Sequence, residues 1–424
     1  MKNFYSKILK VVFTTALFNL SFSQYSNGYI VANEGNFGAA NAEISYIDEN
    51  NVVTNNVYAA ANGGVPLGDV LQSIYFEGNR TFMVLNNSDK ITVANRTTFV
   101  KTTDITSNII QPRYTTIEGG KIYTTNSGSS ATGSYVSVHN AATFDFIKSI
   151  PLNQNGEEIL SVNGKVYVMK SYFGGGNSIE IIDPATDTIT GEIILTGGLQ
   201  SIKASGNQIY AFCSNDAGST VFRINTNTDT VEKSLYTSAV QYQYAYKFAV
   251  DGNNIYIANG LDVYNITTDL NAFNATPLLT VEMSQGWDEF YGLSAIDGKI
   301  FQGSANGFTG NSKLNVYNAN GTFDKSYTAT MGVNGVYKNV YADPSLATNN
   351  TSLTKVSLYP NPVSDILFLK NADALPFQIF DTAGKLVKSG TYRNGIQVSS
   401  LPKGSYIIQV SAQKKSFTEK FIVK

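Results

Sequence analysis

The sequence predicts an all-β chain, a seven-bladed β-propeller followed by a small Ig-like β-sandwich. The composition is rich in β-forming and turn-forming residues, and only 15% of residues are charged. Extended helical periodicity is absent, and a pattern of four short strands recurs about every 45 residues. The 424 residues are enough for more than one domain.

Two kinds of turn mark the repeat. An Asx residue ends the third strand of each unit, where its side chain accepts a hydrogen bond from the backbone two residues on. These residues are Asp48, Asn95, Asn140, Asp183, Asn225, Asn265 and Asn318. A tight turn that requires positive φ precedes the second strand, and such turns end at Asn79, Gly120, Gly164, Asn207, Asn253 and Gly298.

Seven four-stranded units at this spacing favour a closed propeller. The first unit begins with its second strand, at residues 28–32, and its missing first strand is expected from residues 335–341. Such closure pairs the two ends of the domain in one sheet and removes an exposed edge.

The chain divides into four predicted parts. Residues 1–23 have the basic start, apolar stretch and small residues of a signal peptide. Residues 24–343 form the propeller, 344–351 a linker, and 352–424 the small sandwich. Its core strands are expected at 356–360, 366–369, 377–380, 396–398, 406–410 and 417–424. No transmembrane segment is expected.

The tail resembles the type A sorting domain of the type IX secretion system. The resemblance rests on residues 358–362, 379–385 and 401–406 and on the terminal strand to Lys424. It implies secretion to the outer cell surface, the secretion machinery as a partner, removal of the tail, and often attachment to surface lipopolysaccharide. A generic adhesive sandwich is the alternative.

Composition argues against several kinds of site. The net charge of −2 and the lack of a basic stripe make nucleic acid an unexpected partner. Cys213 and His139 are the sole residues of their types, and both are expected to be structural. Since the rim carboxylates Asp69, Asp216, Asp288, Glu34 and Glu289 look isolated, we expect no metal, no cofactor and no catalytic residues. A hydrolase or lyase stays an alternative that would require an acidic cluster.

The rim face is where functional residues are expected. In a propeller, the loops joining second to third strands lie together with those leading to the next sheet, and here both are long. Their aromatic and amide side chains suit a large ligand, flat or sugar-like, although each has a structural role as its alternative. The candidates are Asn33, Asn36, Phe37, Asn86, Asn87, Tyr114, Tyr172, Phe173, Tyr242, Tyr244, Trp287, Tyr291 and Phe308.

Residues 33–38, 41–48, 66–74, 84–91 and 111–114 resemble a family of Bacteroidetes propellers described as YncE-like or surface-layer proteins. That family includes surface lipoproteins that capture vitamin B12. The resemblance implies cobalamin as a bound ligand and a TonB-dependent outer-membrane transporter as a partner. The lipoprotein cysteine is absent here and the later blades match less well, so a glycan- or protein-binding scaffold remains open.

Overall fold

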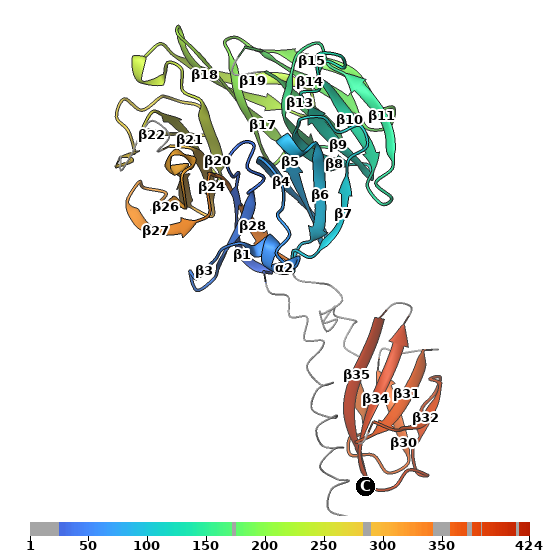
Figure 1. Cartoon of the computed structure of the whole chain (residues 1–424). Helices are drawn as coiled ribbons and strands as arrows, with labels where there is room; N and C mark the ends of the chain where they lie inside the picture. The colour runs from blue at the N-terminus through green and yellow to red at the C-terminus, as the bar shows by residue number, and fades with distance from the viewer. Residues whose placement is uncertain are drawn as a thin grey trace, which may run out of the picture. The chain divides into compact units, whose positions relative to one another are not determined.

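The computed structural model describes residues 25–171, 175–282, 290–341, 357–370, 375–382, 384–412 and 415–424. It separates into two compact units, residues 1–341 and residues 342–424 (Figure 1). The predicted signal peptide and the predicted linker lie outside the described residues.

The described part of the first unit is built of seven four-stranded antiparallel sheets. The first is β28 (Val333–Val340), β1 (Asn27–Asn33), β2 (Glu43–Asp48) and β3 (Val53–Thr54). The second is β4 (Leu71–Glu77), β5 (Arg80–Leu85), β6 (Lys90–Asn95) and β7 (Lys101–Ile105). The third is β8 (Pro112–Glu118), β9 (Lys121–Asn126), β10 (Tyr135–Asn140) and β11 (Phe146–Pro151). The fourth is β12 (Gly156–Val162), β13 (Lys165–Lys170), β14 (Ser178–Asp183) and β15 (Thr188–Ile194).

The remaining sheets repeat the same order. The fifth is β16 (Leu199–Ser205), β17 (Gln208–Asn215), β18 (Gly218–Asn225) and β19 (Thr230–Thr237). The sixth is β20 (Lys247–Asp251), β21 (Asn254–Asn259), β22 (Asp262–Thr267) and β23 (Leu279–Thr280). The seventh is β24 (Gly292–Ile296), β25 (Lys299–Gly303), β26 (Ser312–Asn318) and β27 (Phe323–Ala329). Short helices lie in the connections: α2 (Val57–Ala61) and the 3₁₀ turns η1 (Asn86–Ser88), η2 (Val240–Tyr242) and η3 (Asn306–Phe308).

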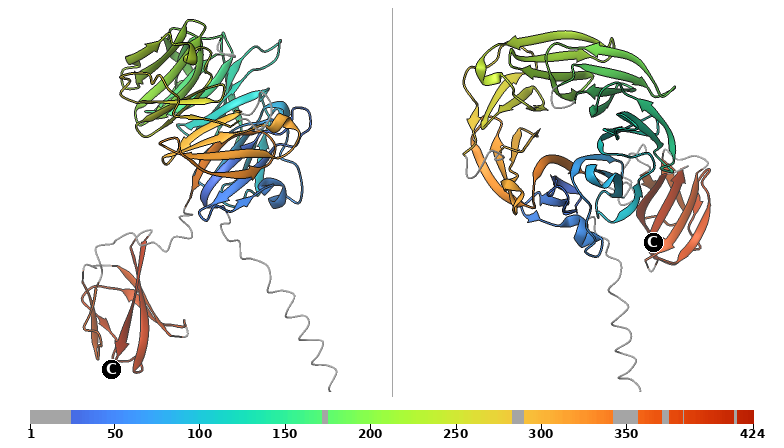
Figure 2. Two further views of the ribbon diagram at one scale, coloured as in Figure 1. Left: turned by 90° about the vertical axis from the view of Figure 1, so that its left-hand side faces the viewer. Right: turned by 45° about the horizontal axis from the view of Figure 1, so that its top comes forward.

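The sheets are arranged around a common centre, as the right-hand view of Figure 2 shows. The first strand of each sheet contacts the first strand of the next, in the closed cycle β4, β8, β12, β16, β20, β24, β28 and back to β4. β28 pairs antiparallel with β1, with Ile30 opposite Tyr337. The predicted closure of the first sheet by a strand from the end of the domain is therefore confirmed.

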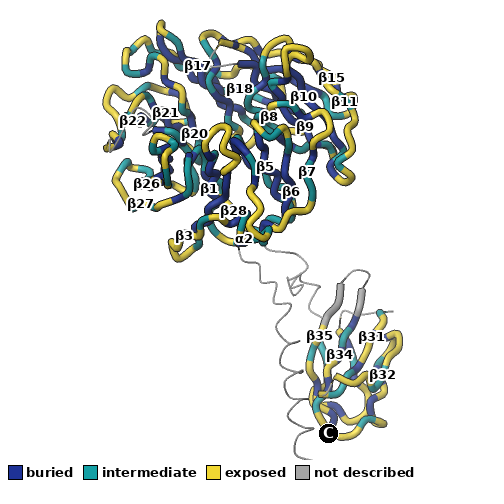
Figure 3. The backbone as a smooth tube through the Cα atoms, in the orientation of Figure 1, coloured by how far each residue is buried: buried dark blue, intermediate teal, exposed yellow. Residues whose placement is uncertain are grey.

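The core lies between neighbouring sheets. Figure 3 shows buried positions along the strands and exposed positions mainly at the turns and loops. One cluster joins Phe82 and Ile91 of the second sheet to Ile122 of the third. Strands of this kind are covered on both faces, so that β13, for example, is buried at each position after its first residue. This explains why the second strands read as continuous apolar runs.

Five of the seven predicted Asx turns form the expected bond, and Asn318 at the end of β26 instead donates from Nδ2 to Thr322 Oγ1 at 2.9 Å. Among the Asx residues, Asp48, Asn95, Asn140, Asp183 and Asn225 each accept a hydrogen bond from the amide two residues on, at 2.8–2.9 Å. The prediction for Asn265 was wrong, because this residue lies inside β22. Its side-chain oxygen instead accepts a hydrogen bond from Asn274 Nδ2, which holds the long connection to β23.

The second unit contains a three-stranded and a four-stranded sheet over one apolar core. The first is β29 (Ser357–Tyr359), β30 (Ile366–Lys370) and β33 (Ile396–Gln397). The second is β32 (Leu386–Thr391), β31 (Pro376–Asp381), β34 (Gly404–Ala412) and β35 (Lys415–Val423). All six predicted tail strands are present, and β32 is an additional strand that the sequence analysis missed.

Candidate functional site

A cluster of charged and polar side chains lies where the first strands of the sheets meet. We call it the hub, and it consists of Glu34, Gln72, Arg113, Tyr114, Glu157, Glu158, Lys203, Lys247, Tyr291, Asn334 and Tyr337. The innermost strands or the residues next to them supply these groups, except Glu34, which directly follows β1. The hub thus gathers polar groups from every sheet of the ring.

Backbone irregularities direct several of these side chains inward. The pairing register shifts at the start of β4, between Leu71 and Ser73, and at the start of β8, between Pro112 and Thr115. Equivalent shifts occur at the start of β12 and β16. A bulge leaves its extra residue out of the ladder and changes the direction of the side chain. This is why a polar residue at the same place in several sheets reaches the hub.

Two ion pairs occupy one part of the hub. Arg113 Nε donates to Glu157 Oε2 at 2.9 Å, and Arg113 Nη1 donates to Gln72 Oε1 at 2.7 Å. Glu158 pairs with Lys203 and also accepts hydrogen bonds from Ser201 Oγ at 2.8 Å and Ile202 N at 2.7 Å. Both glutamates are therefore compensated by a cation.

Glu34 is held differently, by neutral donors. Tyr291 donates its hydroxyl proton to Glu34 Oε2 at 2.6 Å, and Asn334 Nδ2 donates to the same oxygen at 3.2 Å. Burial raises the pKa of the Glu34 carboxyl above its ordinary value, although both hydrogen bonds and the positive charge of Lys247 act in the opposite direction. The effect of burial on this pKa therefore outweighs the effect of the hydrogen-bond partners and of Lys247.

Lys247 is the third cation of the hub. Its Nζ lies 5.4 Å from the ring centroids of Tyr246 and of Tyr291. Burial lowers its pKa to about 8, with Glu34 acting to raise it. In contrast to Arg113 and Lys203, it forms no ion pair within 4.0 Å with any residue that the structure describes.

The exposed rim residues begin beside the hub. Phe37 is 74% exposed and Tyr244 66% exposed, and Asn36 and Asn87 are exposed as well. The Asp69 carboxylate accepts hydrogen bonds from Gly38 N at 2.9 Å and from Asn87 Nδ2 at 2.6 Å. Asp69 therefore holds the Phe37 loop next to η1, which gives this predicted acidic candidate a structural role.

Four other predicted site residues connect the rim loops to the hub through ring contacts and hydrogen bonds. The ring of Tyr291 packs edge-on against Phe308, with 5.3 Å between the ring centroids. Tyr114 accepts a hydrogen bond from Gln72 at 3.5 Å, and burial raises the pKa of its hydroxyl. Asn86 Nδ2 donates to Pro112 O at 3.1 Å, at the start of β8.

Two of the predicted contact residues, Asn33 and Tyr242, are fully buried, and their hydrogen bonds hold the fold. Asn33 donates to Ser45 Oγ at 2.9 Å and to Val31 O at 3.2 Å, which fixes the end of β1. Tyr242 donates to Asn274 O at 2.8 Å and packs inside the fifth and sixth sheets. Tyr172, Phe173 and Trp287 lie outside the described residues, so the structure does not place them.

Comparison with known protein families follows the same division of the chain. Residues 27–334 match the family described as "Domain of unknown function (DUF5074)". The chain belongs to the DUF5074 family. Residues 357–424 match the secretion system C-terminal sorting domain. This tail directs secretion through the type IX system to the cell surface, and it makes the secretion machinery a partner of the chain.

Solved structures support the fold of the DUF5074 region. A quinonprotein alcohol dehydrogenase-like protein from Bacteroides thetaiotaomicron aligns with a TM-score of 0.55 and 14% identity, over 74% of this chain and 79% of that one. A functionally unknown protein from Desulfotomaculum acetoxidans aligns with a TM-score of 0.56 and 12% identity, over 75% of this chain and 100% of that one. No curated protein matches in sequence. The structural likeness indicates a propeller-like all-β fold.

The structure tests the expectations for histidine and cysteine. His139 is fully buried, and its Nε2 lies 2.8 Å from Ser107 O, so it donates to that carbonyl. Cys213 is buried, and burial raises the pKa of its thiol to about 12. Both structural interpretations are confirmed. Across the described ranges there is no group of three or more His, Cys, Asp or Glu residues that could hold a metal ion.

The hub contains most of the residues that the sequence analysis missed, above all Arg113, Glu157, Glu158 and Lys247. A signal exists for Arg113 and Glu157, although not for Glu158 or Lys247. A polar residue stands at the second position of β4, β8, β12, β16 and β28, in each case after an apolar residue, proline or glycine. Only alignment of the repeats at the first strand, rather than at the turns, makes this pattern visible.

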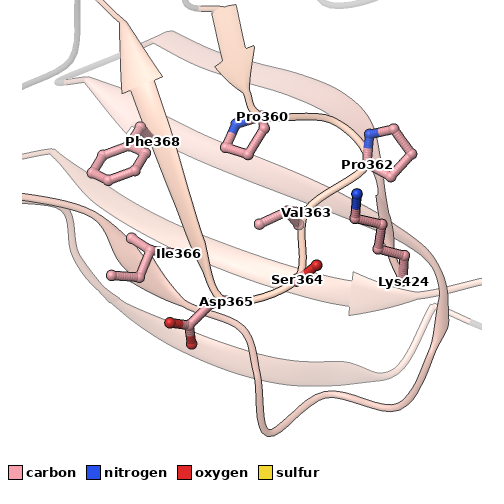
Figure 4. A pocket seen from close by; sticks show the side chains of 8 residues that line it. All are labelled: Pro360, Pro362, Val363, Ser364, Asp365, Ile366, Phe368 and Lys424. Carbon is pink, nitrogen blue, oxygen red and sulfur yellow. The ribbon is translucent and has the colours of Figure 1, made fainter.

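A separate pocket lies in the sorting domain, with a volume of about 370 Å³ (Figure 4). Pro360, Pro362, Ile366 and Phe368 supply apolar walls, and Lys424 supplies a charged edge.

No helix among the residues that the structure describes has the length and apolar character to span a bilayer.

Proposed function

We propose that this chain is a surface-exposed binding protein, a seven-bladed propeller that holds a large polar ligand on its rim face over the hub. The proposed ligand is a corrinoid such as cobalamin, in keeping with the resemblance of residues 33–114 to the YncE-like surface propellers. A TonB-dependent outer-membrane transporter is the proposed recipient of the ligand. The tail is proposed to be an Ig-like sandwich.

The observation that carries this proposal is the placement of exposed aromatic rings at the rim beside the hub. Phe37 and Tyr244 leave most of their surface to solvent, although burial of an aromatic side chain is favourable. Exposed aromatic side chains at a polar site are available for stacking on a flat ligand. The seven sheets and the closed cycle of first-strand contacts support the blade number.

The test is a titration of the secreted chain with cobalamin, followed by calorimetry and by the visible absorption of the corrin. We expect binding at micromolar protein, and we expect Phe37→Ala and Tyr244→Ala each to weaken it about tenfold, because each removes one stacking surface. Phe323→Ala is the matched control. Phe323 is 58% exposed on β27, at the opposite end of the sheet from the rim, and its loss leaves the affinity unchanged.

Absence of both heat and spectral change would exclude the corrinoid. A glycan array and a pull-down with outer-membrane proteins then test the alternative, a glycan- or protein-binding scaffold for adhesion. We propose that the chain is not an enzyme. Turnover of a polysaccharide or lactone by the purified chain would contradict this and support the hydrolase or lyase alternative.

A further inference from the structure

We propose that the hub is a subsite for a single anionic group of the ligand, a phosphodiester or a carboxylate, and that Lys247 is the residue that receives it. This inference rests on the proposed ligand-binding role of the rim face. It requires the ligand to carry an anionic group, which binding to the aromatic rim alone would not require.

The first argument is the pairing of the three hub cations. Arg113 is bound to Glu157 and Lys203 to Glu158, so each of these charges is compensated within the protein. Among the residues that the structure describes, the ammonium of Lys247 faces two tyrosine rings and the more distant carboxylates of Glu34 and Glu158. A desolvated cation without a close anion is costly to the folded state, and an anionic ligand group would remove that cost.

The second argument is that the groups around Lys247 are already engaged with other partners. Within the described ranges, Glu34, Lys203 and Glu158 are the charged side chains that act on it electrostatically. Glu34 accepts from Tyr291 and Asn334, and Glu158 accepts from Lys203, Ser201 and Ile202. Neither carboxylate needs Lys247 as a donor, which leaves the ammonium available to a ligand.

Two tyrosine hydroxyls could assist the lysine. Tyr337 accepts a hydrogen bond from Ile74 N at 3.2 Å, and Tyr114 accepts one from Gln72. Within the described part of the chain neither hydroxyl proton is donated to an acceptor. The charge of Glu158 acts on Lys247, Tyr114 and Tyr337 alike. Beside its two ion pairs, the hub therefore offers one cation and two neutral hydroxyl donors, which are the kinds of group that bind an oxyanion.

Proton uptake provides a specific readout. A lysine with a pKa of about 8 is half deprotonated at pH 8, and a bound anion raises that pKa. Anion binding at pH 8 should therefore take up about half a proton per site, and at pH 6 almost none. The probes are dimethyl phosphate and acetate, since neither titrates between pH 6 and pH 8, with acetamide as the neutral control. Calorimetry in two buffers of different ionisation enthalpy measures the uptake.

Three variants test the assignment. Lys247→Met should weaken binding of the preferred anion about tenfold or more, because it removes a charge-assisted hydrogen bond. Lys247→Arg should retain binding but lose the proton uptake at pH 8, since arginine stays protonated. Lys313→Met, an exposed lysine on β26, should behave as wild type. Circular dichroism verifies that each variant is folded.

The outcomes separate this inference from the proposed function. If neither anion binds the wild type, or if Lys247→Met binds as tightly, the anionic subsite is wrong. Cobalamin binding that Lys247→Met leaves unchanged would also refute the subsite while leaving the proposed function intact. Anion binding without cobalamin binding would keep the subsite and exclude the corrinoid. Preference for dimethyl phosphate over acetate, or the reverse, identifies the anionic group.

Discussion

At the scale of single residues, the hub is defined by ionisable groups that the protein has partly desolvated. Burial shifts Glu34 and Lys247 in opposite directions, and each shift favours the neutral form of the side chain. In both cases the opposite charge nearby is too weak to cancel the effect. Groups with such shifts are characteristic of functional sites, because the folded protein maintains them at a cost to its own stability.

This cost can be measured at Glu34. A carboxyl whose pKa is higher in the folded than in the unfolded state destabilises the fold as the pH rises through those two values. Glu34→Gln retains an acceptor for Tyr291 and removes the charge. We expect its thermal midpoint at pH 7 to exceed that of the wild type by a few degrees, and the difference to vanish near pH 4. A variant that is less stable at pH 7 would show that the carboxylate is a net stabiliser.

At the scale of strands, a repeated set of contacts couples one sheet to the next. In the third sheet, Tyr123 donates its hydroxyl proton to Asp187 Oδ1 at 2.5 Å, and Lys121 Nζ donates to Asp187 Oδ2 at 2.7 Å. In the fourth sheet, Tyr167 and Lys165 form the same contacts with Asp229, both at 2.6 Å. Burial and the neighbouring carboxylate raise the pKa of both tyrosine hydroxyls. The turn of each following sheet is thereby fixed to the strand of the sheet before it.

Removal of one tyrosine hydroxyl should abolish this contact and destabilise the folded protein without disturbing the packing of the ring. We expect Tyr123→Phe and Tyr167→Phe each to lower the free energy of unfolding by about 1 kcal/mol, as measured by urea denaturation. Tyr256→Phe is the matched control, because Tyr256 is the equivalent buried residue of β21. Its pKa is raised by burial and by the charge of Asp251, without a hydrogen bond to a carboxylate among the described residues. Equal losses in all three variants would mean that the effect is general to buried tyrosines and not specific to the contact with aspartate.

At the scale of the whole molecule, the ring of sheets depends on one pairing between distant segments. β28 supplies the first strand of the sheet that β1 begins, and it also contacts β24 and β4. Asn334 and Tyr337 of the same strand belong to the hub, so closure of the ring and completion of the site occur together.

The importance of closure can be tested by truncation. A chain ending at residue 332 lacks β28, leaves the edge of β1 unpaired and should aggregate or unfold without a cooperative transition. A chain ending at Tyr341 retains all seven sheets and should remain monomeric, with a sharp transition. Size-exclusion chromatography and thermal melting distinguish the two. Equal behaviour of the two chains would show that the ring does not depend on β28.

Much of this architecture could be predicted because it depends on local chemistry that recurs along the chain. Asx turns and glycine-containing hairpins specify where strands end, and five of the seven Asx residues form the expected bond. The β28–β1 pairing followed from a unit that lacked a strand. Asn265 was misplaced because its connection to β23 is longer than a turn, so its side chain binds Asn274 instead.

The sequence by itself determined the repeat, the strand order and the secretion tail, because each is encoded in residues near one another in the chain. The closing strand was predictable because the first unit lacks a first strand of its own. Only the tertiary structure decided which side chains share a site. Glu34, Arg113 and Lys247 come from three separate sheets and meet because the first strands converge. Asn33 turns inward to bond Val31 O of its own strand, and Tyr242 bonds Asn274 O of a different connection. Convergence and burial of this kind depend on contacts between residues far apart in sequence, which local patterns do not record.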